Sequence, residues 1–148
     1  MLSSFSIVAN EKYAKEVTFC IYSIRSFYQT PILLYCDEFT KNYVNEFGFK
    51  NIFYRLTTGD SDLQKISHKV RSVKKHNEFH SPEYIYLKMD AMKEAIDNFG
   101  NTLFIDSDIV IARDILGDID DSEVILSPHY HEKKYRTNSI NFGIFNYE

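Results

Sequence analysis

The sequence of 148 residues contains no tryptophan, three prolines, five glycines and only two cysteines. Cys20 and Cys36 lie among apolar neighbours without CxxC spacing, so we predict buried thiols in a reducing compartment. No hydrophobic run reaches the roughly 18 residues that a membrane span requires. Residues 1–10 have neither the basic start nor the long apolar stretch of a signal peptide. These absences predict a cytoplasmic protein without a membrane span.

An excess of positive charge is also missing. Seventeen Lys and Arg residues against 21 Asp and Glu residues give a net charge of −4, so we expect no nucleic-acid partner. Hydrophobic residues make up 44% and charged residues 26%, which is typical of a folded globular protein. The length suits one domain with a sizeable core, and no repeat or linker divides it. We therefore expect a single domain over residues 1–148.

Short apolar runs alternate with segments of helical periodicity. Asn10 and Asp37 are natural caps for the first two helices, and Ser81-Pro82-Glu83 is a strong start for a helix that ends at Phe99. A basic stretch at 63–75 also keeps a helical period, with a cationic face that is usually solvated. The strands expected are 5–9, 32–36, 51–54, 102–105, 124–126 and 140–145. The alternation predicts an α/β fold with a mostly parallel sheet and helices on both faces.

Asp106-Ser107-Asp108 interrupts the apolar pattern directly after the strand at 102–105. Open α/β sheets bind ligands at the carboxyl ends of their strands, where this segment would place two carboxylates. Two close carboxylates need a counterion, and a hard divalent cation shared with substrate phosphates supplies it. We predict a metal site here. The alternative is a surface turn whose aspartates cap the next segment.

Lys88 falls inside the apolar stripe of the helix that precedes this strand. The stripe consists of Tyr84, Leu87, Ala91, Met92, Ala95 and Ile96. A lysine on this face must find a partner or lose solvation at a high free-energy cost. The helix is followed at once by the strand bearing Asp106, so we predict an ion pair with that carboxylate or contact with a bound phosphate. The alternative is a side chain that extends past the stripe to water.

Asn141-Phe142-Gly143 opens the last strand candidate. A glycine inside a strand weakens it, and the usual reason for its presence is a bulge or the close approach of a ligand or another backbone. The sequence leaves these two explanations open.

The loops before that strand contain further polar residues. His129 and His131 would point to the same side of an extended segment, but no third metal ligand has a recognisable spacing, so a contact with substrate is the better interpretation. Asp118, Asp120 and Asp121 lack the glycine and glutamate of a calcium-binding loop and are predicted to be solvated turn residues.

Four landmarks together resemble glycogenin-like glycosyltransferases, which have the Rossmann-like GT-A fold and use nucleotide-diphospho-sugars. Residues 9–14, Ala-Asn-Glu-Lys-Tyr-Ala, look like the first nucleotide-contacting segment of that family. Lys88 and the Phe-Ile-Asp-Ser-Asp run at 104–108 resemble its lysine helix and Asp-x-Asp strand. Residues 141–145, Asn-Phe-Gly-Ile-Phe, look like its Asn-x-Gly strand. The landmarks occur in the family's order over almost the whole chain.

The resemblance implies a role for each matching position. Asn10 and Tyr13 would contact the nucleobase, Tyr13 by stacking. Asp106 and Asp108 would hold Mn²⁺ or Mg²⁺ on the diphosphate, with Asp106 and Ser107 in the donor site. Lys88 would orient the metal carboxylate or the donor. Asn141 and the Gly143 backbone would line the sugar pocket. The donor implied is a UDP-sugar, and the acceptor is an unidentified glycan, protein or small molecule.

The resemblance also implies that this chain is the donor-binding part of a longer enzyme. Family members continue past the Asn-x-Gly strand through acceptor-binding elements and a late metal-binding histidine, so we expect a truncated C-terminus and incomplete activity. Two other functions fit the sequence. Asp106-Ser107-Asp108 superficially matches the nucleophile motif of haloacid-dehalogenase-type phosphatases. A non-catalytic module that binds nucleotide-sugars is the second alternative.

Overall fold

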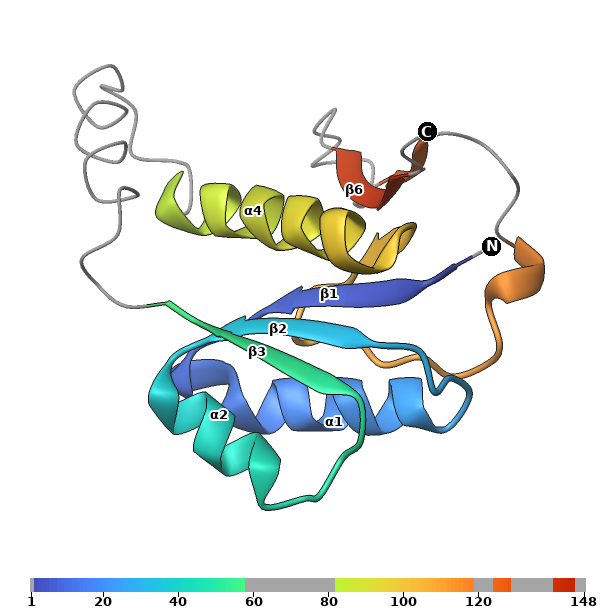
Figure 1. Ribbon diagram of the computed structural model, residues 1–148. Coiled ribbons are helices and arrows are strands. Elements are labelled where there is room, and N and C mark those ends of the chain that lie inside the picture. Colours follow the sequence, from blue (N-terminus) through green and yellow to red (C-terminus); the bar gives the residue numbers. More distant parts are fainter. Residues whose placement is uncertain (1, 58–81, 119–123, 129–139, 146–148) are drawn as a thin grey trace, which may run out of the picture.

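The computed structural model describes residues 2–57, 82–118, 124–128 and 140–145. Within them, six strands form one sheet in the order β3-β2-β1-β4-β6-β5 (Figure 1). The strands are β1 (Ser4–Val8), β2 (Ile32–Cys36), β3 (Ile52–Leu56), β4 (Thr102–Phe104), β5 (Val124–Pro128) and β6 (Ile140–Phe145). The first four strands are parallel to one another, and β6 is antiparallel to both β4 and β5. This arrangement is α/β and compatible with a Rossmann-like fold, which confirms the class that the alternation predicted.

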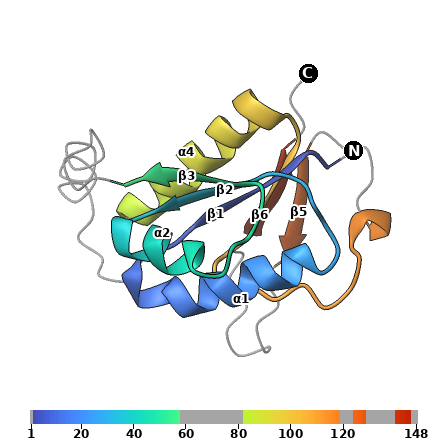
Figure 2. The same cartoon turned by 60° about the horizontal axis from the view of Figure 1, so that its bottom comes forward.

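Two helices cover one face of the sheet. They are α1 (Ala14–Arg25) and α2 (Glu38–Asn45), which lie below the strands in Figure 1 and come forward in Figure 2. Val17, Ile21 and Ile24 on α1 are fully buried against alternate residues of β1 and β2, such as Phe5 and Ile32. The recurrence of apolar residues at three and four positions thus directs α1 onto the sheet.

Among the described residues, one helix covers the opposite face. The helix α4 (Pro82–Phe99) has the bounds expected from the sequence at its described residues, and its buried residues Ala91, Met92 and Ala95 pack on Leu33, Phe104 and neighbouring side chains of the sheet. Because both faces are covered, β1 is buried along its whole length. Helices on both faces were predicted, and the two separate apolar clusters confirm it.

Short polar residues define where the helices begin and end. Asn10 accepts a hydrogen bond from the backbone of Lys12 and caps a 3-10 turn, Glu11–Tyr13, that leads into α1. Asp37 caps α2 by accepting from the backbone of Thr40. Gly100 follows α4 with φ +88°, a conformation that glycine adopts without strain. The caps Asn10 and Asp37 are those that the sequence predicted.

On α2, one of two regular rows of side chains faces the core. Val44 is buried with Thr40, whereas Phe39 and Phe47 are more than half exposed and form a ladder of aromatic rings with Tyr43. Helical spacing alone cannot decide which row is buried. Residues 40 and 44 form one row with regular helical spacing, and residues 39, 43 and 47 form another.

Three further expectations concern a basic helix, membrane spans and the cysteines. The helix expected at 63–75 lies outside the described residues. No described helix has the length and apolar character needed to cross a membrane. Both cysteines are buried free thiols, as predicted.

The burial of α1 gives a direct test of the fold. We expect Ile21→Ala to lower the free energy of unfolding by about 2–5 kcal/mol, because a fully buried side chain is truncated between α1 and the sheet. Phe19→Ala on the same helix is the control, since that ring is 67% exposed and its loss should cost less than about 0.5 kcal/mol. Urea denaturation measures both. Equal losses would contradict the orientation of α1.

Candidate functional site

The order in which the chain adds strands to the sheet reverses between β1 and β4. The chain builds outward from β1 to β2 and β3, and then returns to the other side of β1 with β4. Ligands of open α/β sheets bind at the carboxyl ends of the strands beside such a reversal. Asn10 follows β1 and Asp106 follows β4 at this edge, and the two strands are paired, with Ser6 level with Phe104. The fold therefore brings two of the sequence-predicted positions to adjacent strand ends.

Lys88 and Asp106 form an ion pair at this edge. Lys88 Nζ lies 2.5 Å from Asp106 Oδ1, and the two side chains are 38% and 40% exposed. The ammonium group also lies 5.3 Å from the centre of the Phe104 ring, on the last residue of β4. The ion pair confirms the partner predicted for Lys88, and it leaves each of the two side chains partly accessible to a ligand.

Asp106-Ser107-Asp108 forms a tight turn beside α1. The backbone of Ile109 donates to the Asp106 carbonyl, and the Cys20 thiol lies 3.9 Å from the same oxygen. Burial raises the pKa of Cys20 to about 12, and the negative charges of Asp108 and Asp106 add to this effect. Both carboxylates thus lie near Cys20 and on one side of the sheet edge. Asp108 is exposed and Asp106 is half-buried.

The segment that follows Asp108 is fastened to α1. The backbone of Ile111 donates to Ser23 Oγ at 2.9 Å, and that hydroxyl donates to the carbonyl of Cys20. Further along, the Tyr28 hydroxyl donates to Asp114 Oδ1 and accepts from the backbone of Ile115. Sequence reasoning missed these bonds because they join residues more than 80 positions apart. They hold the aspartate turn from its C-terminal side.

A single carboxylate fixes the segment after β1. Asp37 Oδ2 accepts from the backbone of Glu11 at 2.7 Å while Oδ1 accepts from Thr40, so this residue ties the 3-10 turn to α2. Burial raises the pKa of Asp37, but the hydrogen bonds from Thr40 and Glu11 outweigh it and lower the pKa below its usual value. The sequence predicts that Asp37 caps α2. It does not predict the hydrogen bond from Glu11 to the same carboxylate.

Tyr13 ends the same 3-10 turn. Its side chain is 36% exposed, and Lys12 Nζ lies 5.2 Å from the ring centre. The ring is thus accessible at the carboxyl edge of the sheet, where the resemblance places a stacked nucleobase.

Asn141 and Gly143 belong to β6, which places its first residues at the same edge. Thr102 pairs with Phe145 and Leu103 with Ile144, so the N-terminal end of β6 points toward the carboxyl end of β4. On the other side of β6, Ile125 pairs with Ile144 and Leu126 with Phe142, so Gly143 occupies a β-bulge. A bulge is one of the two explanations that the sequence left open for Gly143. The backbone geometry of the bulge therefore accounts for the glycine at this position.

The two aspartates suit a hard divalent cation in ligand type but do not complete its coordination. Among the described residues, no three His, Cys, Asp or Glu side chains gather into a metal-binding group. Asp106 and Asp108 supply carboxylate oxygens, which Mg²⁺ and Mn²⁺ prefer, and Mg²⁺ usually takes its remaining ligands from water and phosphate. The donor set therefore fits a cation that arrives together with a diphosphate.

Some predicted residues cannot be placed. His129, His131, Asp120 and Asp121 lie outside the described residues, and only the backbone of Asp118, in a 3-10 turn, is described. The side chains of Asn141 and the other β6 residues are likewise not described. The prediction of roles for them stands as the sequence left it.

Comparisons with known proteins add no assignment. A search against protein-family models finds no match, and a search of curated proteins finds none of significance. The likeness to glycogenin-like enzymes thus remains a prediction from four sequence landmarks.

Asp37 gives a test of the geometry at this edge. Because its pKa is lowered, its contribution to stability is present above the ordinary Asp pKa of about 3.9 and is lost as the pH falls through the lower folded value. We expect Asp37→Ala to cost about 1–2 kcal/mol at pH 7 and less at pH 3. Urea denaturation at several pH values measures this. Glu38→Ala, at a neighbouring carboxylate 61% exposed, is the control with little effect. A loss independent of pH would contradict the assignment.

Proposed function

We propose that this chain binds a nucleotide-diphospho-sugar, with UDP as the nucleotide, and belongs to a metal-dependent glycosyltransferase with a GT-A-like fold. The observation that carries the proposal is the position of Asp106-Ser107-Asp108. The turn follows β4 at the carboxyl edge beside the reversal of the sheet, and Lys88 is paired with its first carboxylate. This is where a diphosphate would meet a cation.

The residues of the site divide into three groups by the part of the donor they face. Asn10 and Tyr13, after β1, would contact the nucleobase. Asp106 and Asp108 would hold Mn²⁺ or Mg²⁺, with Ser107 between them. Asn141 and the backbone of Gly143, at the head of β6, would line the sugar. The support for this order is that β1, β4 and β6 are consecutive in the sheet, so the groups lie along one edge.

The proposed chemistry is the departure of a nucleoside diphosphate from the sugar. Negative charge develops on the β-phosphate as the bond breaks, and a bound divalent cation neutralises it. Lys88 holds the Asp106 carboxylate by one oxygen and keeps it oriented toward the ligand. Positioning of the acceptor would supply the remainder of the rate.

Binding of the nucleotide is the first test. At a UDP concentration about 100 times its Kd with saturating Mn²⁺, we expect stabilisation of about 2.7 kcal/mol, or roughly 5–10 °C in melting temperature for a chain of this size. Asp108→Ala should abolish the shift because it removes one of two carboxylate ligands. Asp97→Ala is the matched control, since this aspartate pairs with Lys93 on the exposed face of α4. Differential scanning fluorimetry measures all three.

The outcomes separate the proposal from its rivals. Stabilisation by Mg²⁺ with beryllofluoride, and none by UDP with Mn²⁺, would favour the phosphatase. Absence of a shift with any nucleoside diphosphate would remove the donor site. Binding of UDP-sugars without release of UDP, even with acceptors and an extended chain, would favour a non-catalytic module.

A further inference from the structure

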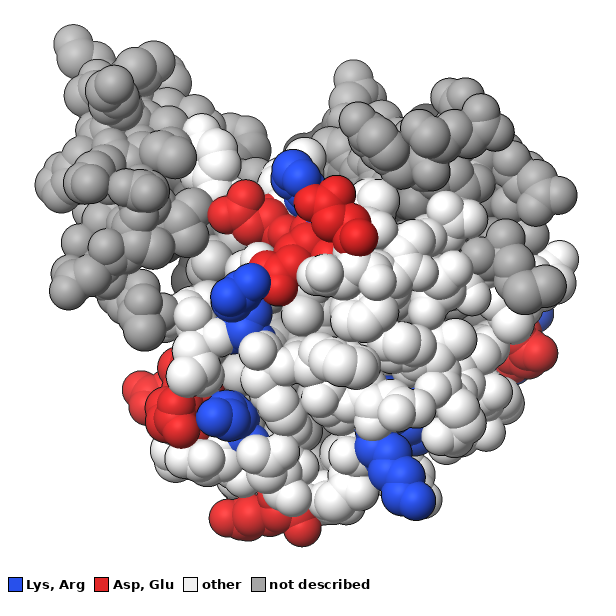
Figure 3. Space-filling model, in the orientation of Figure 1, with Lys and Arg blue, Asp and Glu red and all other residues white. Residues whose placement is uncertain are grey.

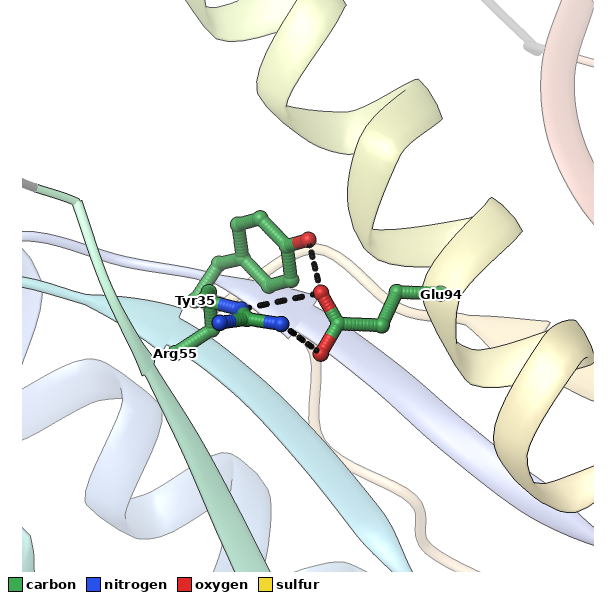
Figure 4. Close-up of polar contacts among 3 residues, drawn as sticks. All are labelled: Tyr35, Arg55 and Glu94. Carbon is green, nitrogen blue, oxygen red and sulfur yellow. Dashed lines mark hydrogen bonds and ion pairs between the residues drawn. The ribbon is translucent and has the colours of Figure 1, made fainter. Parts of the chain in front are cut away.

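Three side chains join α4 to strands β2 and β3 near the carboxyl ends of those strands. Glu94 on α4 receives Arg55 of β3 in a two-point ion pair, with Nη2 to Oε1 at 2.8 Å and Nε to Oε2 at 3.0 Å (Figure 4). The Tyr35 hydroxyl of β2 donates to Oε2 at 2.6 Å. On the surface in Figure 3, charged side chains of both signs gather over this part of α4. We name Tyr35, Arg55 and Glu94 the helix clamp.

Among the α4 side chains whose burial is described, Ala91, Met92 and Ala95 are buried, and Leu87 and Phe99 pack against the same cluster. Apolar contacts have no preferred direction, so they fix the position of the helix along its axis less sharply than directional hydrogen bonds do. The helix clamp is different because paired hydrogen bonds to a guanidinium hold a carboxylate in one position and orientation. Tyr35 is 8% exposed, so its hydroxyl is a rigid third point. The clamp therefore fixes where α4 lies along its own axis.

Lys88 lies six residues before Glu94 on the same helix, about 9 Å along the axis at 1.5 Å per residue. A helix moves as a stiff rod, so a displacement at Glu94 is carried to Lys88 almost undiminished. Lys88 Nζ and Asp106 Oδ1 lie 2.5 Å apart, so an axial shift of about 1 Å would lengthen and weaken this contact. The clamp and the site are thus linked through one rigid element.

We infer that Glu94 is a positioning residue that sets Lys88 against the Asp106 carboxylate from outside the site. The effect on donor binding rests on the proposed function, whereas the effect on Lys88 does not. Glu94 touches neither Asp106 nor the proposed ligand in this arrangement. Its influence passes through the axial position of α4, and Arg55 and Tyr35 are the fixed points on the sheet.

The first experiment needs no ligand. Lys88 engaged with Asp106 is less available to an acylating reagent than a free lysine. Acetylation with limiting acetic anhydride is followed by mass spectrometry, with exposed Lys15 as the internal reference. We expect Glu94→Gln to raise the relative acetylation rate of Lys88 roughly threefold or more, as a coupled pair would show. Asp97→Asn on the same helix is the control of equal charge change, because it removes an exposed pair with Lys93 and leaves every hydrogen bond of the helix clamp in place. An unchanged rate in Glu94→Gln, or an equal rise in Asp97→Asn, would overturn the inference.

The second experiment is a double-mutant cycle on UDP and Mn²⁺ affinity by calorimetry. We expect Glu94→Gln to weaken binding roughly threefold to tenfold in the wild-type background and to have no further effect in Lys88→Met. A general loss of structure would instead weaken both backgrounds equally, which would count against positioning. If wild type binds no UDP, the proposed function fails and the acetylation result still decides the inference.

A milder variant protects the test against unfolding. Arg55→Lys keeps the positive charge on the exposed edge strand but loses the two-point geometry. If Glu94→Gln does not fold, Arg55→Lys is used in its place, with the same expected direction in both experiments and a smaller effect. No change in Lys88 acetylation with this variant would then overturn the inference.

Discussion

The ion pair between Lys88 and Asp106 is the contact on which the candidate site depends. It joins the helix on one face of the sheet to the carboxyl end of a central strand, at the edge where the sheet changes direction. If either residue were replaced, the other would keep a partly buried charge without a counter-charge, which costs free energy. Because both remain partly exposed, the pair is at once a structural contact and a surface that a charged ligand can reach.

The rest of the edge is organised around this pair by bonds that cross long stretches of sequence. Asp37 ties the segment after β1 to α2, and Ser23 and Tyr28 fasten the segment after Asp108 to α1. These contacts come from α1, from the turn after it and from the N-terminus of α2, and they hold two loops that follow adjacent strands. Loops that are held this firmly present their side chains with little further loss of conformational entropy on binding, which is what a ligand site on a parallel sheet needs.

The helix clamp extends this organisation to the neighbouring strands β2 and β3. Glu94 accepts two hydrogen bonds from Arg55 and one from Tyr35, beside the apolar contacts of α4 with the sheet. Burial raises the pKa of Tyr35, and its hydrogen bond to Glu94 raises it further, so the hydroxyl remains a donor throughout the physiological range. The directional hydrogen bonds of the helix clamp thus fix the position of α4 along its own axis more sharply than its apolar contacts do.

The sequence by itself determined the α/β alternation, the caps Asn10 and Asp37, the buried cysteines and the need of Lys88 for a partner. Each follows from local periodicity, capping chemistry or the cost of burying a charge. Tertiary structure decided which residues meet: that β1 and β4 are neighbours, that Asp37 also holds Glu11, and that Arg55 and Glu94 form a clamp. It also decided that Val44, rather than Phe39 or Phe47, is buried on α2. Strand order and the facing of a helix with two apolar rows depend on contacts distant in the chain, and no local pattern encodes them.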